Sequence, residues 1–189
     1  VSEYLNLSRI ETGRMPLSLQ SNVDVWVLDM RRNIRNRLTF DEERDLSPIW
    51  SPDDTRIAYV SHMKTAPGVY IKAADGSGEA RLIYPTDQRL FLSDWSPDGQ
   101  LICASVTNQS QDILIIPVDG EQEPWTFMAT GAQEYGPAFS PDGKWLAFTS
   151  EETSLSLVWA ENFGSGTFTE TTAVSPSRAS SPVAAILCF

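Results

Sequence analysis

One short turn motif recurs along this chain at a nearly constant spacing, and it constrains the fold more than any other feature. Trp50-Ser51-Pro52-Asp53-Asp54 returns as Trp95-Ser96-Pro97-Asp98-Gly99 and again as Phe139-Ser140-Pro141-Asp142-Gly143. The motif serines therefore lie about 44 residues apart. A second landmark keeps the same spacing: a short run rich in Val, Ile and aromatic residues, which begins at Asp24, Gly68, Asp112 and Ser156. Two markers with one period indicate a structural repeat.

Each repeat predicts four short strands. Ser-Pro-Asp-Gly is typical of a type I turn, because proline presets φ, Asp or Ser bonds to the nearby backbone, and Gly ends the turn. The turn is followed by apolar runs at 57–60, 102–105 and 146–149, then by the second landmark, and then by a weaker strand near 37–39, 81–83 and 125–127. Four strands in about 44 residues match the blade period of a propeller. We therefore predict an all-β, incomplete β-propeller of about four blades, each a four-stranded antiparallel sheet.

The repeat also predicts the organisation of the chain. We expect propeller blades over 22–162, divided into 22–45 (partial), 46–88, 89–132 and 133–162 (partial). Residues 1–21 read as an incomplete amino-terminal segment, and residues 163–189 as a low-complexity tail that we expect to be disordered. Because the period stops after about Val158, we expect the repeat to be interrupted there by truncation or by a change of reading frame.

Composition narrows the choice of partners. A net charge of −11 makes binding to nucleic acid or anionic lipid unfavourable. No apolar stretch approaches the roughly 18 residues that a membrane-spanning helix needs.

The two cysteines, Cys103 and Cys188, are too few and too distant for a disulfide framework or a thiolate zinc site. Cys103 aligns with Ala58 and Ala147, which predicts a small apolar residue between blades.

The chain carries no catalytic motif. His62 is the sole histidine and no Gly-x-Ser-x-Gly segment supplies a nucleophile, so we expect His62 to be an exposed structural residue. The motif aspartates Asp53, Asp98 and Asp142 recur once per blade, too far apart to share one ion. They read as turn residues, and we expect neither a metal nor a cofactor.

The best candidate site is the mouth of the central channel. In a propeller the innermost strand lines the channel, so the residues that lead into it lie at the mouth. By the repeat register, these are Arg44, Asp45, Arg89, Gln133 and Glu134. We expect them to contact a protein or peptide, or a small ligand. A basic cluster of Arg31, Arg32, Arg35 and Arg37 reads first as a solvated face and second as a docking patch.

The series Trp-Ser-Pro-Asp-Gly, Ile-Ala-Tyr at 57–59, Val-Trp-Val at 25–27 and Arg-Leu-Thr at 37–39 resembles the WD40-like repeat of TolB-type propellers. Segments 24–38 and 93–149 look most similar to the propellers fused to bacterial serine/threonine kinases, although this chain has no kinase motif. The resemblance implies a bacterial propeller of six to eight blades and a periplasmic or other extracytoplasmic location.

Two functions follow as alternatives. The first is a non-catalytic module that binds a protein or ligand within an envelope or signalling protein. The second is the gating propeller of a prolyl-oligopeptidase-type serine peptidase, without its hydrolase domain. A Gly-x-Ser-x-Gly motif encoded downstream would favour the peptidase, and a kinase domain with an apolar span encoded upstream would favour the sensor.

Overall fold

The computed structural model describes residues 23–40, 42–63, 65–151 and 156–161, the last of these as backbone alone. Over these ranges the chain forms thirteen strands and no helix. The segments 1–21 and 163–189, for which the sequence predicts an incomplete start and a disordered tail, lie outside the described residues.

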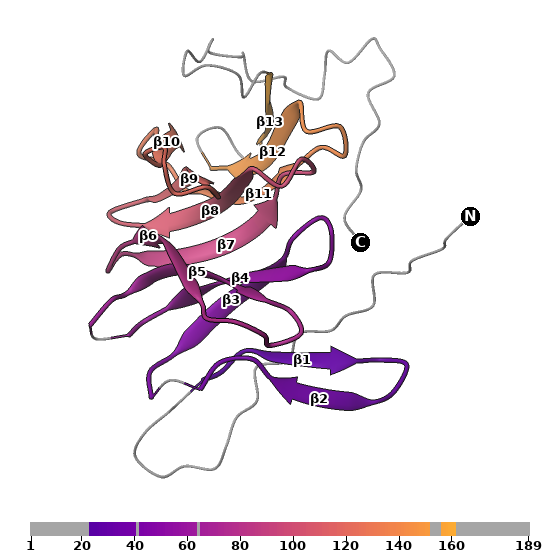
Figure 1. Cartoon of the computed structure of the whole chain (residues 1–189). Helices are drawn as coiled ribbons and strands as arrows, with labels where there is room; N and C mark the ends of the chain where they lie inside the picture. Colours follow the sequence, from indigo (N-terminus) through magenta and orange to yellow (C-terminus); the bar gives the residue numbers. More distant parts are fainter. Residues whose placement is uncertain (1–22, 41, 64, 152–155, 162–189) are drawn as a thin grey trace.

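The strands form four antiparallel sheets that follow one another in sequence order, from the indigo hairpin to the orange sheet in Figure 1. The first sheet contains β1 (Trp26–Asp29) and β2 (Ile34–Arg37). The second contains β3 (Asp45–Trp50), β4 (Arg56–Ser61), β5 (Gly68–Ala73) and β6 (Arg81–Pro85). The third contains β7 (Arg89–Trp95), β8 (Leu101–Thr107), β9 (Gln111–Pro117) and β10 (Trp125–Met128), and the fourth contains β11 (Glu134–Phe139), β12 (Trp145–Ser150) and β13 (Ser156–Glu161).

Each strand pairs with the next strand in the chain, so every sheet is a simple meander. Successive sheets meet through their first strands: β3 contacts β7, and β7 contacts β11. The strands β3, β7 and β11 are therefore innermost, and the sheets are stacked face to face. The predicted all-β architecture of four-stranded antiparallel sheets is confirmed.

In the second and third sheets, the second strand joins two hydrophobic cores, because alternate side chains point to opposite faces. In β4, Ile57 and Tyr59 pack with Val25 and Leu38, which directly precede β1 and follow β2. Ala58 and Val60 instead join the core shared with the third sheet, which contains Leu90, Leu92, Ile102, Ala104 and Ile116. Both faces of the second sheet are covered in this way.

The third and fourth sheets meet in the same manner. Cys103, Ile113 and Ile115 form a buried cluster with Leu146 and Phe148. Phe148 meets the ring of Phe127 edge-on, with centroids 6.0 Å apart. As the alignment with alanines predicts, Cys103 is a buried residue between sheets; burial and the nearby charge of Asp94 raise the pKa of its thiol.

The motif aromatic residues all reach these cores, but to different depths. Trp95 is 4% exposed and lies in the core between the second and third sheets. Trp50 and Phe139 are half-buried and pack at the edges of the neighbouring cores. Full burial of such a ring contributes about 2 kcal/mol or more, and Trp95 is the one closest to that limit.

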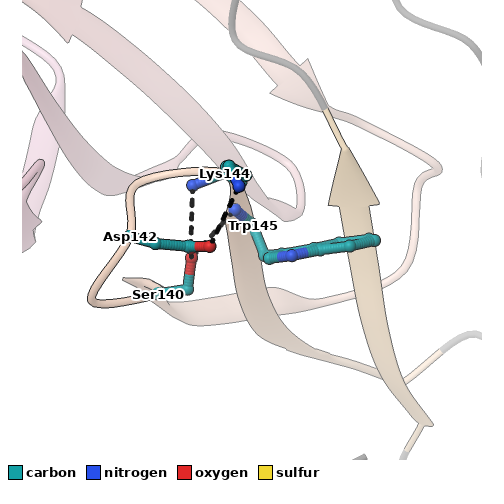
Figure 2. A network of polar contacts seen from close by, with 4 residues as sticks. All are labelled: Ser140, Asp142, Lys144 and Trp145. Atoms are coloured by element: carbon teal, nitrogen blue, oxygen red, sulfur yellow. Dashed lines mark hydrogen bonds and ion pairs between the residues drawn. The ribbon is translucent and has the colours of Figure 1, made fainter.

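The motif serine closes each turn by using its hydroxyl twice. In the fourth sheet, the Ser140 hydroxyl donates to Asp142 Oδ1 at 2.6 Å and accepts the Trp145 N–H at 3.0 Å, as Figure 2 shows. Ser51 and Ser96 make the equivalent bonds in the other two turns. The serine hydroxyl is the largest cause that lowers the pKa of Asp142, and in the first turn the same contact, reinforced by Thr55, lowers the pKa of Asp53 to about 2.

The last motif position requires a left-handed backbone. Gly99 and Gly143 have φ of 75° and 71°, and Asp54, which stands in place of glycine in the first turn, has φ of 58°. Successive turns also lie against one another: a Cβ built on Gly99 would be 3.7 Å from Pro52, and one built on Gly143 would be 3.7 Å from Pro97. The turn motif thus reverses the chain between two strands of a sheet and also packs against the turn of the neighbouring sheet.

Cationic side chains of the second sheet tie it to both neighbours. Lys72 Nζ donates to the carbonyl of Leu38 at 3.0 Å. On the other side, Arg81 donates to the carbonyls of Val118 and Asp119 at 2.6 and 3.0 Å. Charged donors satisfying backbone carbonyls in this way are stronger than neutral pairs.

Asp94 joins the third and fourth sheets. Its Oδ1 accepts the N–H of Trp95 and its Oδ2 accepts the N–H of Phe139, both at 2.8 Å. Trp95 and Phe139 occupy the same motif position, so one carboxylate links equivalent points of two sheets. Burial raises the pKa of Asp94, and the two backbone bonds oppose that rise.

Candidate binding site at the channel mouth

The two ends of the sheets differ in which connections they carry. One end, the turn end, carries the Ser-Pro-Asp turns and the β5–β6 and β9–β10 hairpins. The other end, the mouth end, carries the β4–β5 and β8–β9 loops and the connections β6–β7 and β10–β11 that lead from one sheet to the next. All five residues that the sequence predicts for the site lie where the innermost strands begin, at the mouth end.

Three of these residues occupy one register position. The carbonyl of Arg44 accepts the N–H of His62 at 2.9 Å, and the carbonyl of Gln133 accepts the N–H of Glu151 at 3.0 Å. Arg89 pairs with Thr107. His62, Thr107 and Glu151 are each the same number of residues beyond their motif serine. Arg44, Arg89 and Gln133 are therefore equivalent, and we call them the mouth triplet.

The mouth triplet is accessible to solvent. Arg44 and Arg89 are exposed and Gln133 is half-buried. Among the described residues, neither arginine forms an ion pair with a carboxylate. The guanidinium carbon of Arg89 lies 5.3 Å from the centroid of the Phe91 ring, within the range of a cation–π contact.

The next residue of each innermost strand is buried instead. Asp45 and Glu134 are 0% exposed, and Leu90 is 2% exposed. Asp45 pairs in register with Ser61, and Glu134 with Ser150. Because neighbouring residues of a strand face opposite ways, an exposed mouth triplet places these side chains inside. The structure thus divides the five predicted residues into three that a ligand can reach and two that support the strands.

Glu134 is held by two hydroxyl groups. Its Oε1 accepts hydrogen bonds from Thr130 and from Ser150, the latter at 3.5 Å. Oε2 is buried and has no hydrogen-bond partner among the described residues. Thr130 belongs to the connection between sheets, so this buried carboxylate fixes the course of the chain as it enters β11.

Phe91 is an exposed residue beside the predicted site that the sequence prediction did not name. Its side chain is 37% exposed although both neighbours in β7, Leu90 and Leu92, are buried. The alternation along Arg89-Leu90-Phe91-Leu92 carries the signal: if Leu90 and Leu92 face the core, Phe91 faces the same side as Arg89. Phe91 therefore extends the accessible surface from the mouth into the inner face of β7.

The remaining predictions concern His62, a metal site and a membrane-spanning helix. His62 is half-buried rather than exposed, because it follows directly on β4 and its N–H donates to the carbonyl of Arg44, the residue before β3. Within the described ranges, no three His, Cys, Asp or Glu side chains are placed to hold a metal ion. The part of the chain that the structure describes contains no helix long and apolar enough to cross a membrane.

The curated proteins that are similar to this chain in sequence include a peptidase and a TolB homolog. The uncharacterized peptidase YuxL of Bacillus subtilis (strain 168) is 27% identical over an alignment of 169 residues, gaps included, and the match covers 69% of this chain and 25% of YuxL. The Protein TolB homolog of Chlorobium luteolum is 29% identical over 132 residues, which cover 69% of this chain and 29% of that protein. The chain thus spans between a quarter and a third of the length of either relative.

The fold is similar to that of solved structures. The crystal structure of TolB from Acinetobacter baumannii superposes with a TM-score of 0.59 at 22% identity, over 77% of this chain and 36% of that one. This likeness supports the propeller architecture inferred from the stacked sheets. A family model described as the TolB beta propeller domain matches residues 25–185, most of the sequence. The repeat, the stacked sheets and this match together show that the chain belongs to the TolB β-propeller domain family.

Proposed function

We propose that this chain is a non-catalytic module that receives a protein or peptide at the mouth end of its sheets. The observation that carries the proposal is the contrast within one register position: the mouth triplet presents two arginines and a glutamine to solvent, whereas the turn end repeats the same serine, proline and aspartate in every sheet. A surface that differs from blade to blade on a repeating frame suits recognition of an irregular ligand.

The family resemblance supports an extracytoplasmic setting, in which such a module would act as the sensing or interacting part of an envelope or signalling protein. The chain spans only part of its relatives, so the activity of the whole protein belongs to this proposal as well.

Site-specific photo-crosslinking tests the position of the ligand. A photoreactive phenylalanine derivative would replace Phe91 at the mouth or, as a matched control, Glu121, which is exposed in the β9–β10 hairpin at the turn end. Each protein would be irradiated with a pool of synthetic decapeptides of random sequence, and the adducts counted by mass spectrometry. We expect adducts at position 91 well above those at position 121. Equal labelling at both positions would contradict the proposal.

A second function is favoured by the match to YuxL, a protein described as a peptidase. In that case the chain would be the propeller that admits peptides to a hydrolase domain. Sequencing the complete gene separates the two: an encoded Gly-x-Ser-x-Gly segment with a hydrolase fold supports the peptidase, and its absence from the full gene removes that alternative.

A further inference from the structure

The turn end of the sheets contains four Asp-Gly sequences that share one local geometry. They are Asp75-Gly76, Asp98-Gly99, Asp119-Gly120 and Asp142-Gly143. In each of them, the aspartate carboxylate accepts the N–H two residues on, and the glycine has a positive φ. The ring closed by that hydrogen bond contains the glycine nitrogen, so the carboxyl group is held beside the nitrogen in all four. Attack of such a nitrogen on the carboxyl carbon is the first step in the isomerisation of aspartate.

The four glycine nitrogens differ in whether they are hydrogen-bonded. Three N–H groups donate to a carbonyl three residues earlier, at 3.0, 2.8 and 2.8 Å: those of Gly76, Gly99 and Gly143. The N–H of Gly120 has no acceptor among the described residues, and Gly120 is exposed. Since a bonded N–H must leave its acceptor before the nitrogen can react, Gly120 carries the most available nucleophile of the four.

Arg81 of the second sheet reaches the same amide. Its Nη1 donates to the carbonyl of Asp119 at 3.0 Å, and a Cβ built on Gly120 would lie 3.5 Å from that nitrogen. The Asp119 carbonyl and the Gly120 N–H belong to one peptide group, and the oxygen takes up the negative charge when the nitrogen loses its proton. A guanidinium that donates to this oxygen therefore stabilises the reactive anion.

The equivalent hairpin of the second sheet, with Asp75-Gly76 at its turn, lacks this contact. Arg37 stands in the first sheet at the position that Arg81 has in the second. Its guanidinium, however, donates to the carbonyl of Thr39 at 2.8 Å and pairs with Asp24 at 2.8 Å. Two identical dipeptides in equivalent hairpins thus have different surroundings.

We propose that Asp119-Gly120 is a modification site, at which the folded chain converts aspartate into isoaspartate with the help of Arg81. The Gly120 nitrogen bonds to the carboxyl carbon of Asp119, and its proton leaves with a carboxyl oxygen as one water molecule. A water molecule then breaks the bond between this nitrogen and the former carbonyl carbon, so the overall mass is unchanged. The carbonyl that Arg81 contacts becomes a carboxylate, and the hydrogen bond between the two sheets becomes an ion pair. This reaction does not depend on what binds at the mouth end.

One incubation of the intact chain at neutral pH compares all four sequences. Digestion and mass spectrometry with electron-transfer fragmentation would distinguish isoaspartate from aspartate at each of them. We expect isoaspartate to form at Asp119 at least about tenfold faster than at Asp75. In urea the two rates should converge, because neither the free N–H nor the arginine contact distinguishes them in the unfolded chain. Equal rates in the folded chain would contradict the proposal.

Arg81→Gln tests the role of the guanidinium. We expect the rate at Asp119, divided by the rate at Asp75, to fall about tenfold, the effect of one hydrogen bond to a charged group. The ratio is the readout because a loss of stability would raise both rates together. The matched control is Lys72→Gln, which removes the other cation that the second sheet directs at a backbone carbonyl of a neighbouring sheet. An unchanged ratio in Arg81→Gln, or an equal fall in Lys72→Gln, would overturn the inference.

Discussion

The two ends of the same sheets follow different rules. At the turn end, Ser51, Ser96 and Ser140 repeat one set of hydrogen bonds, and each turn packs against the previous one. At the mouth end, one register position holds Arg44, Arg89 and Gln133 and repeats only in its backbone bonds. The difference teaches that the repeated residues in this chain maintain the stacking of sheets, whereas the solvent-exposed residues at the mouth end are free to differ from one sheet to the next.

Asp94 tests this comparison most strongly, because it is not a repeated residue and yet it links two sheets. Asp94→Ala removes the acceptor of the Trp95 and Phe139 N–H groups, and we expect a loss of about 3 kcal/mol in the free energy of unfolding. Urea denaturation followed by tryptophan fluorescence would measure it. An unchanged midpoint would mean that the link between the third and fourth sheets contributes nothing.

The dependence of this loss on pH has a defined sign. Because burial raises the pKa of Asp94 above 3.8, the folded chain binds the proton more readily than the unfolded chain does. Its contribution to stability is therefore larger at low pH and is lost as pH rises through the folded pKa. We expect the gap between the unchanged chain and Asp94→Ala to widen as pH falls from 7 toward 3.8; a narrowing gap would contradict the assignment.

A pair of serines sharpens the comparison between the ends. Ser96 at the turn end and Ser110 at the mouth end both donate to an aspartate two residues on, but only Ser96 also accepts a backbone N–H, that of Leu101. We expect Ser96→Ala to cost about 2 kcal/mol, because a part-buried N–H loses its acceptor. Ser110→Ala should change stability by less than about 0.5 kcal/mol. Equal losses in the two urea transitions would break the division.

The smallest expected effect comes from restoring the repeat. Asp54 stands where the other turns have glycine, and its φ of 58° is unfavourable for a residue with a Cβ. We expect Asp54→Gly to stabilise the chain by roughly 0.5–1 kcal/mol, since relief of this strain exceeds the added entropy of the unfolded glycine. A calorimetric melting temperature below that of the unchanged chain would show that the Asp54 side chain contributes more than its backbone costs.

The sequence predicted the fold well because its signals are local. A Ser-Pro-Asp-Gly turn followed by a strand needs only a few neighbouring residues, and the fixed spacing supplied the stacking. The link made by Asp94 could not be predicted in this way, because it joins residues 45 apart in the sequence through contact between two sheets.

The repeat register predicted where the candidate site lies, but it did not predict which of its residues are accessible to solvent. Arg44 and Asp45 are adjacent in the sequence, and only the structure places the first outside and the second inside. The predicted residues all lie where the innermost strands begin, so Phe91, which lies further along β7, is not among them. The apolar residues Leu90 and Leu92 on either side of Phe91 are the signal in the sequence, because strand alternation turns Phe91 away from the core that they enter.

The alternation along β4 and β8 has a consequence for how such a chain can change over time. Ile57 and Ala58 serve different neighbours, as do Ile102 and Cys103, so each of these strands carries two interleaved sets of contacts. An insertion of one residue would exchange the two sets and spoil both cores at once. Heritable change in length is therefore confined to the connecting loops, or to the gain and loss of whole units.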